Sequence, residues 1–168
     1  GQFTLALKTD GTLWAWGDNF YTQLGLGLVT NQLVPTQVGT DNDWYMISAG
    51  NNHSLATKLS GPLYSWGSNS HGQLGTGNTQ ATNVPTLVNS SVPWKSISAG
   101  QTHSLAIKDD NTLWAWGNNS SGQLGDSSTT NRTLPTQIGT NNNWYSMETG
   151  SDFSVAIKST GTLWTWGL

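Results

Sequence analysis

The sequence contains no cysteine and few charged residues. Without cysteine the chain forms no disulfide bonds, and the usual clue to an oxidising or reducing compartment is missing. Only 9% of the residues are charged, and a net charge of −3 with an isoelectric point near 5.3 provides no basic surface for DNA or RNA. No apolar run approaches the ~20 residues of a membrane-spanning helix. We therefore expect neither nucleic-acid nor membrane binding.

The sequence also lacks a cluster of residues that would support catalysis or bind a cofactor. His53-Ser54 and His103-Ser104 suggest a nucleophilic pair, but the pair recurs at a fixed interval and Phe3 replaces its histidine. A catalytic residue has no reason to be copied in this way. Asp41-Asn42-Asp43 offers alternating oxygen ligands without the closing glutamate of a calcium loop, so turn formation explains it better. We predict no enzyme activity, no cofactor and no metal site.

Tryptophan is abundant, with ten residues, and most of these recur at one interval. The dipeptides separated by 50 residues are Trp16-Gly17, Trp66-Gly67, Trp116-Gly117 and Trp166-Gly167. A fixed period in this range predicts a propeller or a solenoid. The chain is thus interpreted as a single array over residues 1–168, with repeats 1–50, 51–100 and 101–150 and a partial fourth repeat, 151–168.

Each repeat carries the pattern of a β-hairpin. Two short apolar runs, Leu55–Thr57 and Leu63–Trp66, flank a turn that ends at Gly61. Asn111 is the one replacement for glycine at this turn position, which predicts a positive φ there. Apolar residues occupy both faces of the second strand, so we expect both faces to be buried, as in a propeller blade.

Two further strands are expected in each repeat. Val34–Val38 contains Pro35, which an outer-edge strand tolerates, and Trp44–Ser48 runs on toward a glycine. Four strands per repeat is the number in a propeller blade. The predicted fold class is therefore an all-β propeller segment with three full four-stranded repeats and a partial fourth.

The combined motifs resemble one known family over essentially the whole chain. Trp-Gly-x-Asn-x-x-Gly-Gln-Leu-Gly, Val-Pro-Thr and Ile-Ser-Ala-Gly-x-x-His-Ser-Leu-Ala are similar to the repeat of the regulator of chromosome condensation family. The resemblance implies a β-propeller, usually of seven blades. Thr22 departs from the pattern, because glycine stands at positions 72 and 122, and predicts a different path for the first loop.

Three repeats and a fraction do not close a ring of about four to eight blades. The array is therefore expected to be part of a seven-bladed ring or to be completed by oligomerisation. It begins without methionine and within a repeat, which favours a segment of a longer protein. The compartment stays undetermined, although scarce lysine and glutamate with abundant asparagine and threonine favour a microbial extracellular or surface location.

Differences between the repeats are the best guide to specificity. The loop after each Trp-Gly carries Phe20-Tyr21 in the first repeat, Ser70-His71 in the second and Ser120-Ser121 in the third. Exposed aromatic residues are typical of binding hot spots, with packing within the loop as the alternative explanation.

Four lysines share one repeat position: Lys8, Lys58, Lys108 and Lys158. They predict a ring of cations at solvated strand ends, or a site for an anionic partner.

Two functions remain open at this stage. The first is a non-catalytic scaffold that binds a protein partner through the loops after Trp-Gly; the resemblance implies such binding roles, including nucleotide exchange, enzyme inhibition and anchoring of ligase complexes. The second is a structural protein whose copies join through incomplete blades into a ring or filament. No loop identifies itself as the one that performs nucleotide exchange.

Overall fold

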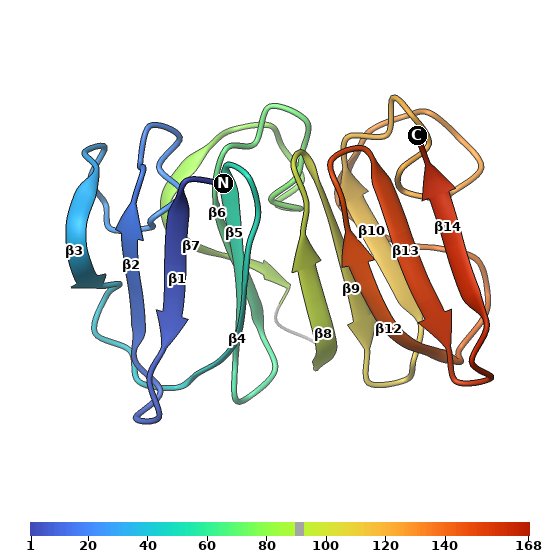
Figure 1. Cartoon of the computed structure of the whole chain (residues 1–168), viewed down its shortest axis with the longest axis horizontal. Coiled ribbons are helices and arrows are strands. Elements are labelled where there is room, and N and C mark those ends of the chain that lie inside the picture. Colours follow the sequence, from blue (N-terminus) through green and yellow to red (C-terminus); the bar gives the residue numbers. More distant parts are fainter. Residues whose placement is uncertain (90–92) are drawn as a thin grey trace.

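The computed structural model describes residues 1–89 and 93–168 as four antiparallel β-sheets arranged in an arc (Figure 1). These residues contain strands, turns and loops but no helix, as the all-β prediction required. The first sheet contains β1 (Phe3–Leu7), β2 (Leu13–Gly17) and β3 (Gln32–Gln37); the second contains β4 (Trp44–Ala49), β5 (His53–Lys58), β6 (Leu63–Gly67) and β7 (Thr82–Asn89); the third contains β8 (Trp94–Ala99), β9 (His103–Lys108), β10 (Leu113–Gly117) and β11 (Arg132–Gln137); the fourth contains β12 (Trp144–Thr149), β13 (Phe153–Lys158) and β14 (Leu163–Gly167).

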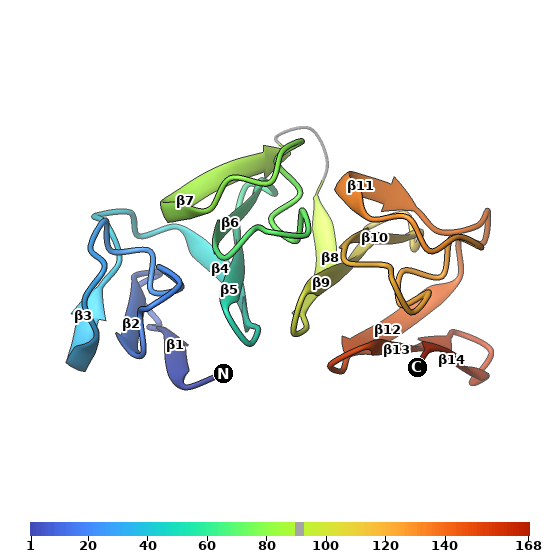
Figure 2. The ribbon, with the colours of Figure 1, turned by 90° about the horizontal axis from the view of Figure 1, so that it is seen from above.

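The sheets radiate like the blades of a propeller, with β3, β7 and β11 on the outside of the arc (Figure 2). The Val-Pro-Thr strands are therefore outermost, as Pro35 predicted. Each four-stranded sheet takes its innermost strand from the preceding 50-residue repeat, because β4 pairs with β5 and β8 pairs with β9.

The predicted hairpin is present in every sheet. β5 and β6 pair without interruption from His53 opposite Gly67 to Thr57 opposite Leu63. The turn residue has φ of 109° at Gly61 and 62° at Asn111. The asparagine substitution thus marks a left-handed backbone position, as its local hydrogen-bonding side chain permits.

The hydrophobic core lies between the sheets. Leu13 of the first sheet and Leu24 of the loop that follows β2 pack with Trp44 and Trp66 of the second sheet, and the two later interfaces likewise combine leucines of one sheet with a tryptophan pair of the next. The paired indoles in each interface have nearly constant centroid separations: 6.4 Å for Trp44–Trp66, 6.2 Å for Trp94–Trp116 and 6.4 Å for Trp144–Trp166. The 50-residue period therefore encodes the contact between neighbouring blades.

The four in-phase lysines lie at the strand ends opposite the Trp-Gly loops, where they cover indole and phenol rings. The Nζ atom of Lys108 is 3.3 Å from the centroid of Trp114, and that of Lys8 is 3.7 Å from Trp14. Lys58 also forms ion pairs of 2.6 Å with Asp41 and 2.8 Å with Asp43. Cation–π contacts give these lysines a packing role.

Candidate functional site

The loops after Trp-Gly share one internal frame, built by a buried asparagine in each. The Oδ1 atom of Asn69 accepts a hydrogen bond of 3.0 Å from the amide of Leu74, and its Nδ2 donates to the carbonyls of Asn78 and Gln80. Asn19 and Asn119 make the corresponding contacts in the other two loops. The asparagine of the repeat motif therefore fixes the shape of the loop.

The glutamine of the Gln-Leu-Gly motif ties each loop to the next sheet. The side-chain oxygen of Gln73 accepts a hydrogen bond from the amide of His71. Its main-chain carbonyl accepts bonds from Ser104 Oγ and Trp116 Nε1 of the following sheet, at 2.9 and 2.8 Å. Gln23 and Gln123 repeat the arrangement, so every loop is held from within and from the neighbouring blade.

Thr22 does not alter the path of the first loop, so that prediction was wrong. Thr22 has φ of 61°, and its amide bonds the carbonyl of Asn19 at 3.0 Å, as the Gly72 amide bonds Asn69. Its Oγ1 atom lies 2.6 Å from the carbonyl oxygen of Tyr21 and 3.0 Å from that of Thr82, so its one proton is shared between these two acceptors. The hydroxyl thereby links the first loop to the second sheet and compensates for an unfavourable backbone conformation.

The six predicted site residues occupy equivalent tips on the three loops. Phe20 and Tyr21 make an edge-to-face contact with centroids 5.0 Å apart, and remain 77% and 45% exposed. Together with Ser70 they line a groove of about 380 Å³ between the first and second loops. The lining of this groove does not include His71, Ser120 or Ser121.

Two apolar residues of the first loop were missed at the sequence level. Leu28 and Val29 are 51% and 69% exposed, and neither was among the predicted site residues. The corresponding residues are Asn78 and Thr79 in the second loop, so comparison of the repeats at these positions would have found them. We refer to Phe20, Tyr21, Leu28 and Val29 as the first-loop patch.

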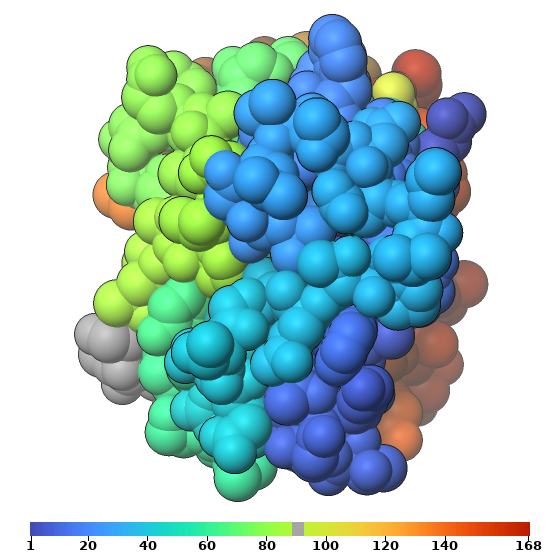
Figure 3. Space-filling model, turned by 90° about the vertical axis from the view of Figure 1, so that its left-hand side faces the viewer, coloured from blue at the N-terminus to red at the C-terminus, as the bar shows by residue number. Residues whose placement is uncertain are grey.

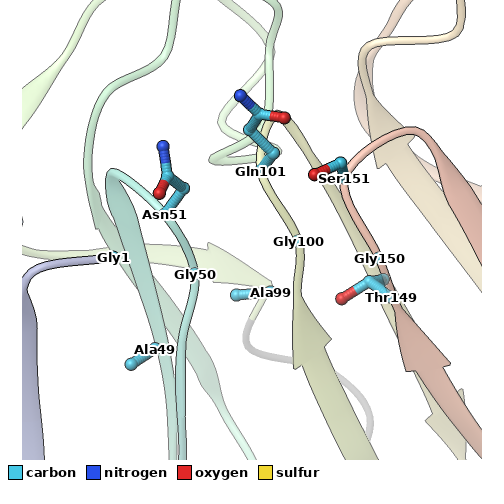
Figure 4. A pocket seen from close by; sticks show the side chains of 10 residues that line it. All are labelled: Gly1, Ala49, Gly50, Asn51, Ala99, Gly100, Gln101, Thr149, Gly150 and Ser151. Carbon is cyan, nitrogen blue, oxygen red and sulfur yellow. The ribbon is translucent and has the colours of Figure 1, made fainter.

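A second concavity lies where the innermost strands reach the loop end of the arc (Figure 4). Gly50, Gly100 and Gly150 line it, and the amide of Asn51 bonds the carbonyl of Gly100 at 3.0 Å. Its volume is about 320 Å³, and none of its lining residues carries an ionisable side chain. This concavity offers hydrogen-bonding groups but no acid–base pair.

The His-Ser pairs connect neighbouring sheets. His53 Nε2 lies 2.9 Å from Ser104 Oγ, whose hydroxyl proton is already donated to the carbonyl of Gln73. His53 must therefore donate from Nε2, which leaves its buried Nδ1 unprotonated and without a hydrogen-bond partner among the described residues. Burial lowers the pKa of His53 to about 3, with a further contribution from His103, and lowers that of His103 to about 4. The geometry assigns these pairs an interblade role.

The described residues provide few groups for other chemistry. Across 1–89 and 93–168, no group of three or more histidine or acidic side chains is placed to hold a metal ion. Asp41 and Asp43 bind Lys58 instead. The same ranges contain no helix with the length and hydrophobicity needed to cross a membrane.

The comparison with known protein families covers most of the chain. The sequence profile of the regulator of chromosome condensation (RCC1) repeat matches residues 10–57, 60–107 and 110–157. The chain belongs to the regulator of chromosome condensation repeat family. A second profile of this repeat matches residues 94–123. The resemblance inferred from the motifs is therefore confirmed, and propellers of this family commonly mediate protein interactions.

Solved structures place the repeats in a propeller. Human WBSCR16 superposes with a TM-score of 0.88 at 22% identity, over 99% of this chain and 45% of its own. Prp20p from Saccharomyces cerevisiae, described together with its binding to Gsp1p and histones, gives 0.86 at 27% identity, over 99% and 43%. Yeast RCC1 (Prp20) bound to Kap60 gives 0.85 at 27% identity, over 99% and 42%. The chain thus spans less than half the length of these relatives.

Proposed function

We propose that this protein is a non-catalytic scaffold that binds a protein partner through its loop face, defined as residues 18–31, 68–81 and 118–131. The observation that carries the proposal is the contrast between an invariant loop frame and its variable tips. Asn69 and Gln73 hold the second loop through the same contacts that their counterparts make in the first and third. A rigid frame lowers the entropy cost of presenting different side chains to a partner.

Family membership supports the same proposal. Proteins with this repeat are typically binding or exchange-factor proteins. The yeast relative is described in complex with Kap60 and in terms of its binding to Gsp1p and histones. Binding to a protein is what these descriptions share, so it is the property we transfer to this chain; none of these particular partners is transferred.

Photo-crosslinking from both ends of the sheets tests the proposal. Benzoylphenylalanine would replace Tyr21, Ser70 or Ser120 on the loop face, and Asp10 or Asp109 at the opposite end. In extract from the source organism, we expect one protein to be crosslinked from the loop positions and not from Asp10 or Asp109. Equal crosslinking from both ends, or none from the loop face, contradicts the proposal.

Self-association is a second candidate, favoured by the exposed apolar residues of the fourth sheet. Leu163 and Trp164 of β14 are exposed, and β14 forms one edge of a three-stranded sheet. An open edge with apolar side chains favours pairing with another chain. Two copies supply eight sheets, which is one more than a seven-bladed ring requires.

Light scattering over a range of concentrations separates the two candidates. A discrete dimer that persists on dilution supports self-association, and the loop face then belongs to the combined ring. A monomer at all concentrations excludes self-association and leaves the scaffold proposal intact.

A further inference from the structure

The first loop differs from the other two at four exposed positions, 20, 21, 28 and 29. Its tip is Phe20-Tyr21, and its second stretch contains Leu28-Val29. The corresponding stretches are Ser70-His71 with Asn78-Thr79 in the second loop and Ser120-Ser121 with Ser128-Thr129 in the third. The two stretches of the first loop lie close together, because Asn19 directly precedes Phe20 and its Nδ2 donates to the carbonyl of Leu28 at 2.9 Å.

Packing within the fold does not require this apolar surface. The second loop lies between neighbours on both sides, and its tip still carries the exposed Ser70 and a half-buried His71. The exposure of Phe20 is therefore a property of the loop position rather than of the first sheet's place at one end of the arc. Exposed aromatic side chains that the fold does not use are characteristic of binding surfaces.

The patch adjoins an elongated groove. Phe20, Tyr21 and Thr22 form one wall of the 380 Å³ groove, and Ser70, Thr79 and Ala81 contribute to the other. A second groove of about 490 Å³ shares Thr22 and Ala81 with it and continues along Thr82–Val84 and Thr86 of β7. This part of the surface belongs to the blue and green segments that meet in Figure 3. An extended peptide segment matches such a shape.

Charge is distributed unevenly between the two ends of the sheets. The five lysines lie at the end opposite the loops, where Asp10, Asp41, Asp43, Asp109 and Asp110 balance them. The loop end and the adjoining part of β12 contain four carboxylates and one cation: Asp18, Asp126, Glu148 and Asp152, and Arg132. This end therefore carries the whole net charge of −3. Arg132 is bound to Asp126 at 2.7 Å.

The first loop also holds a carboxylate at its first position, where the other loops have none. Asp18 stands where the second and third loops have Ser68 and Asn118. Its Oδ1 atom accepts a hydrogen bond from the Phe20 amide, as Asn118 Oδ1 does from the Ser120 amide, and its Oδ2 atom accepts one of 2.8 Å from Gln23 Nε2. Both donors are uncharged, so they leave the negative charge of Asp18 unneutralised. The charge is available to an incoming cation beside the aromatic pair.

We propose that the first-loop patch and its groove bind an extended basic peptide segment of a protein partner, with an apolar side chain against Phe20 and Tyr21 and a lysine or arginine beside Asp18. The inference rests on the proposed scaffold function and specifies its partner. The apolar contact provides most of the affinity, and the acidic end of the sheets selects against acidic segments.

Phage display of random twelve-residue peptides against the whole chain tests this inference. We expect the selected peptides to combine an aromatic or aliphatic residue with lysine or arginine. An enriched sequence would then be synthesised with a fluorescent label, alongside a version in which glutamate replaces each basic residue. Selection of acidic peptides, or no enrichment at all, overturns the inference.

The repeats themselves provide matched variants for the binding measurement. Replacing Phe20→Ser, Tyr21→His, Leu28→Asn and Val29→Thr gives the first loop the side chains of the second, and should weaken binding by roughly tenfold or more. Asp18→Asn keeps a side-chain oxygen for the Phe20 amide but loses the second oxygen that accepts from Gln23 Nε2. It should weaken binding about two- to fivefold at low salt, with less effect at high salt, and this salt dependence identifies the contribution of the charge. The control Ser121→His, in the third loop, should leave binding unchanged.

The outcomes separate this inference from the scaffold proposal. Equal binding of the peptide to the four-residue variant and the unaltered chain overturns the peptide site. If photo-crosslinking still captures a partner on the loop face, the scaffold proposal survives that result. If no partner is crosslinked from the loop face, the scaffold proposal fails, whatever peptides are selected.

Discussion

At the scale of single residues, the interblade histidines make stability dependent on pH. His53 and His103 are neutral in the folded protein because burial lowers their pKa values to about 3 and about 4. In the unfolded chain they titrate near 6.5. The folded state therefore binds fewer protons between these values, and stability present above pH 6.5 is lost as the pH falls.

We expect the free energy of unfolding to decrease by about 1.4 kcal/mol per pH unit for each histidine as the pH falls from about 6 to 4.5. Urea unfolding followed by tryptophan fluorescence at several pH values measures this. The variant His53→Phe with His103→Phe adopts the residue found at positions 3 and 153 and should lose most of the slope. An unchanged slope in this variant would assign the acid sensitivity to other groups.

Lys108 provides a second prediction at the residue scale. Its ammonium lies 3.3 Å from the Trp114 centroid, and burial lowers its pKa while Asp110 opposes that shift. Lys108→Met keeps the aliphatic contact and removes the charge, so we expect a loss of about 0.5–1 kcal/mol in unfolding free energy. Chemical denaturation at pH 7 measures the change. A variant as stable as the unaltered protein would show that only the aliphatic stem contributes.

At the scale of single elements, the loop frame depends on one asparagine in each repeat. Asn69→Ala leaves the Leu74 amide and the carbonyls of Asn78 and Gln80 without these partners. We expect a loss of roughly 2–3 kcal/mol in stability, because unpaired buried polar groups are costly. The Leu74 amide should also exchange faster with deuterium. The exposed Asn83, whose Nδ2 reaches the Gly27 carbonyl at 3.3 Å, provides a milder control as Asn83→Ala.

The sequence predicted the strands better than their grouping into blades. The period and the proline of Val34–Val38 indicated hairpins and an outermost strand, and the structure has both. A period has no intrinsic starting point, however, so it did not reveal that β4 belongs with β5. Thr22 was misjudged because glycine at the equivalent positions suggested a steric requirement, whereas threonine adopts φ of 61° there with a new hydrogen bond.

The candidate site was only partly accessible to sequence reasoning. Phe20 and Tyr21 were identified as a difference between repeats, and both are exposed. Leu28 and Val29 were overlooked because the surrounding stretch is polar in the other repeats. The separation of charge between the two ends of the sheets was not visible either. Asp18 and Asp152 lie at the same end only because antiparallel pairing places Gly17 opposite Phe3 and Gly167 opposite Phe153.

At the scale of the whole molecule, stability should be unevenly distributed along the arc. Each sheet contacts only its neighbours, so the four-stranded inner sheets have an apolar interface on both sides and the end sheets on one. Leu55 and Leu105 are fully buried in the inner sheets, whereas Phe153 and Leu163 of the fourth sheet are exposed. In such arrays stability is approximately a sum of unit and nearest-neighbour contributions.

Native-state hydrogen exchange of the 168-residue chain measures this distribution directly. We expect the slowest exchange in β5, β6, β9 and β10, and faster exchange in β13 and β14, where the second interface is missing. Trp116→Phe removes the Nε1 bond to the Gln73 carbonyl and should accelerate exchange on both sides of that interface, while leaving β1 and β2 less affected. Uniform protection across all four sheets, together with a uniform response to Trp116→Phe, would instead indicate one cooperative unit in which the arc unfolds as a whole.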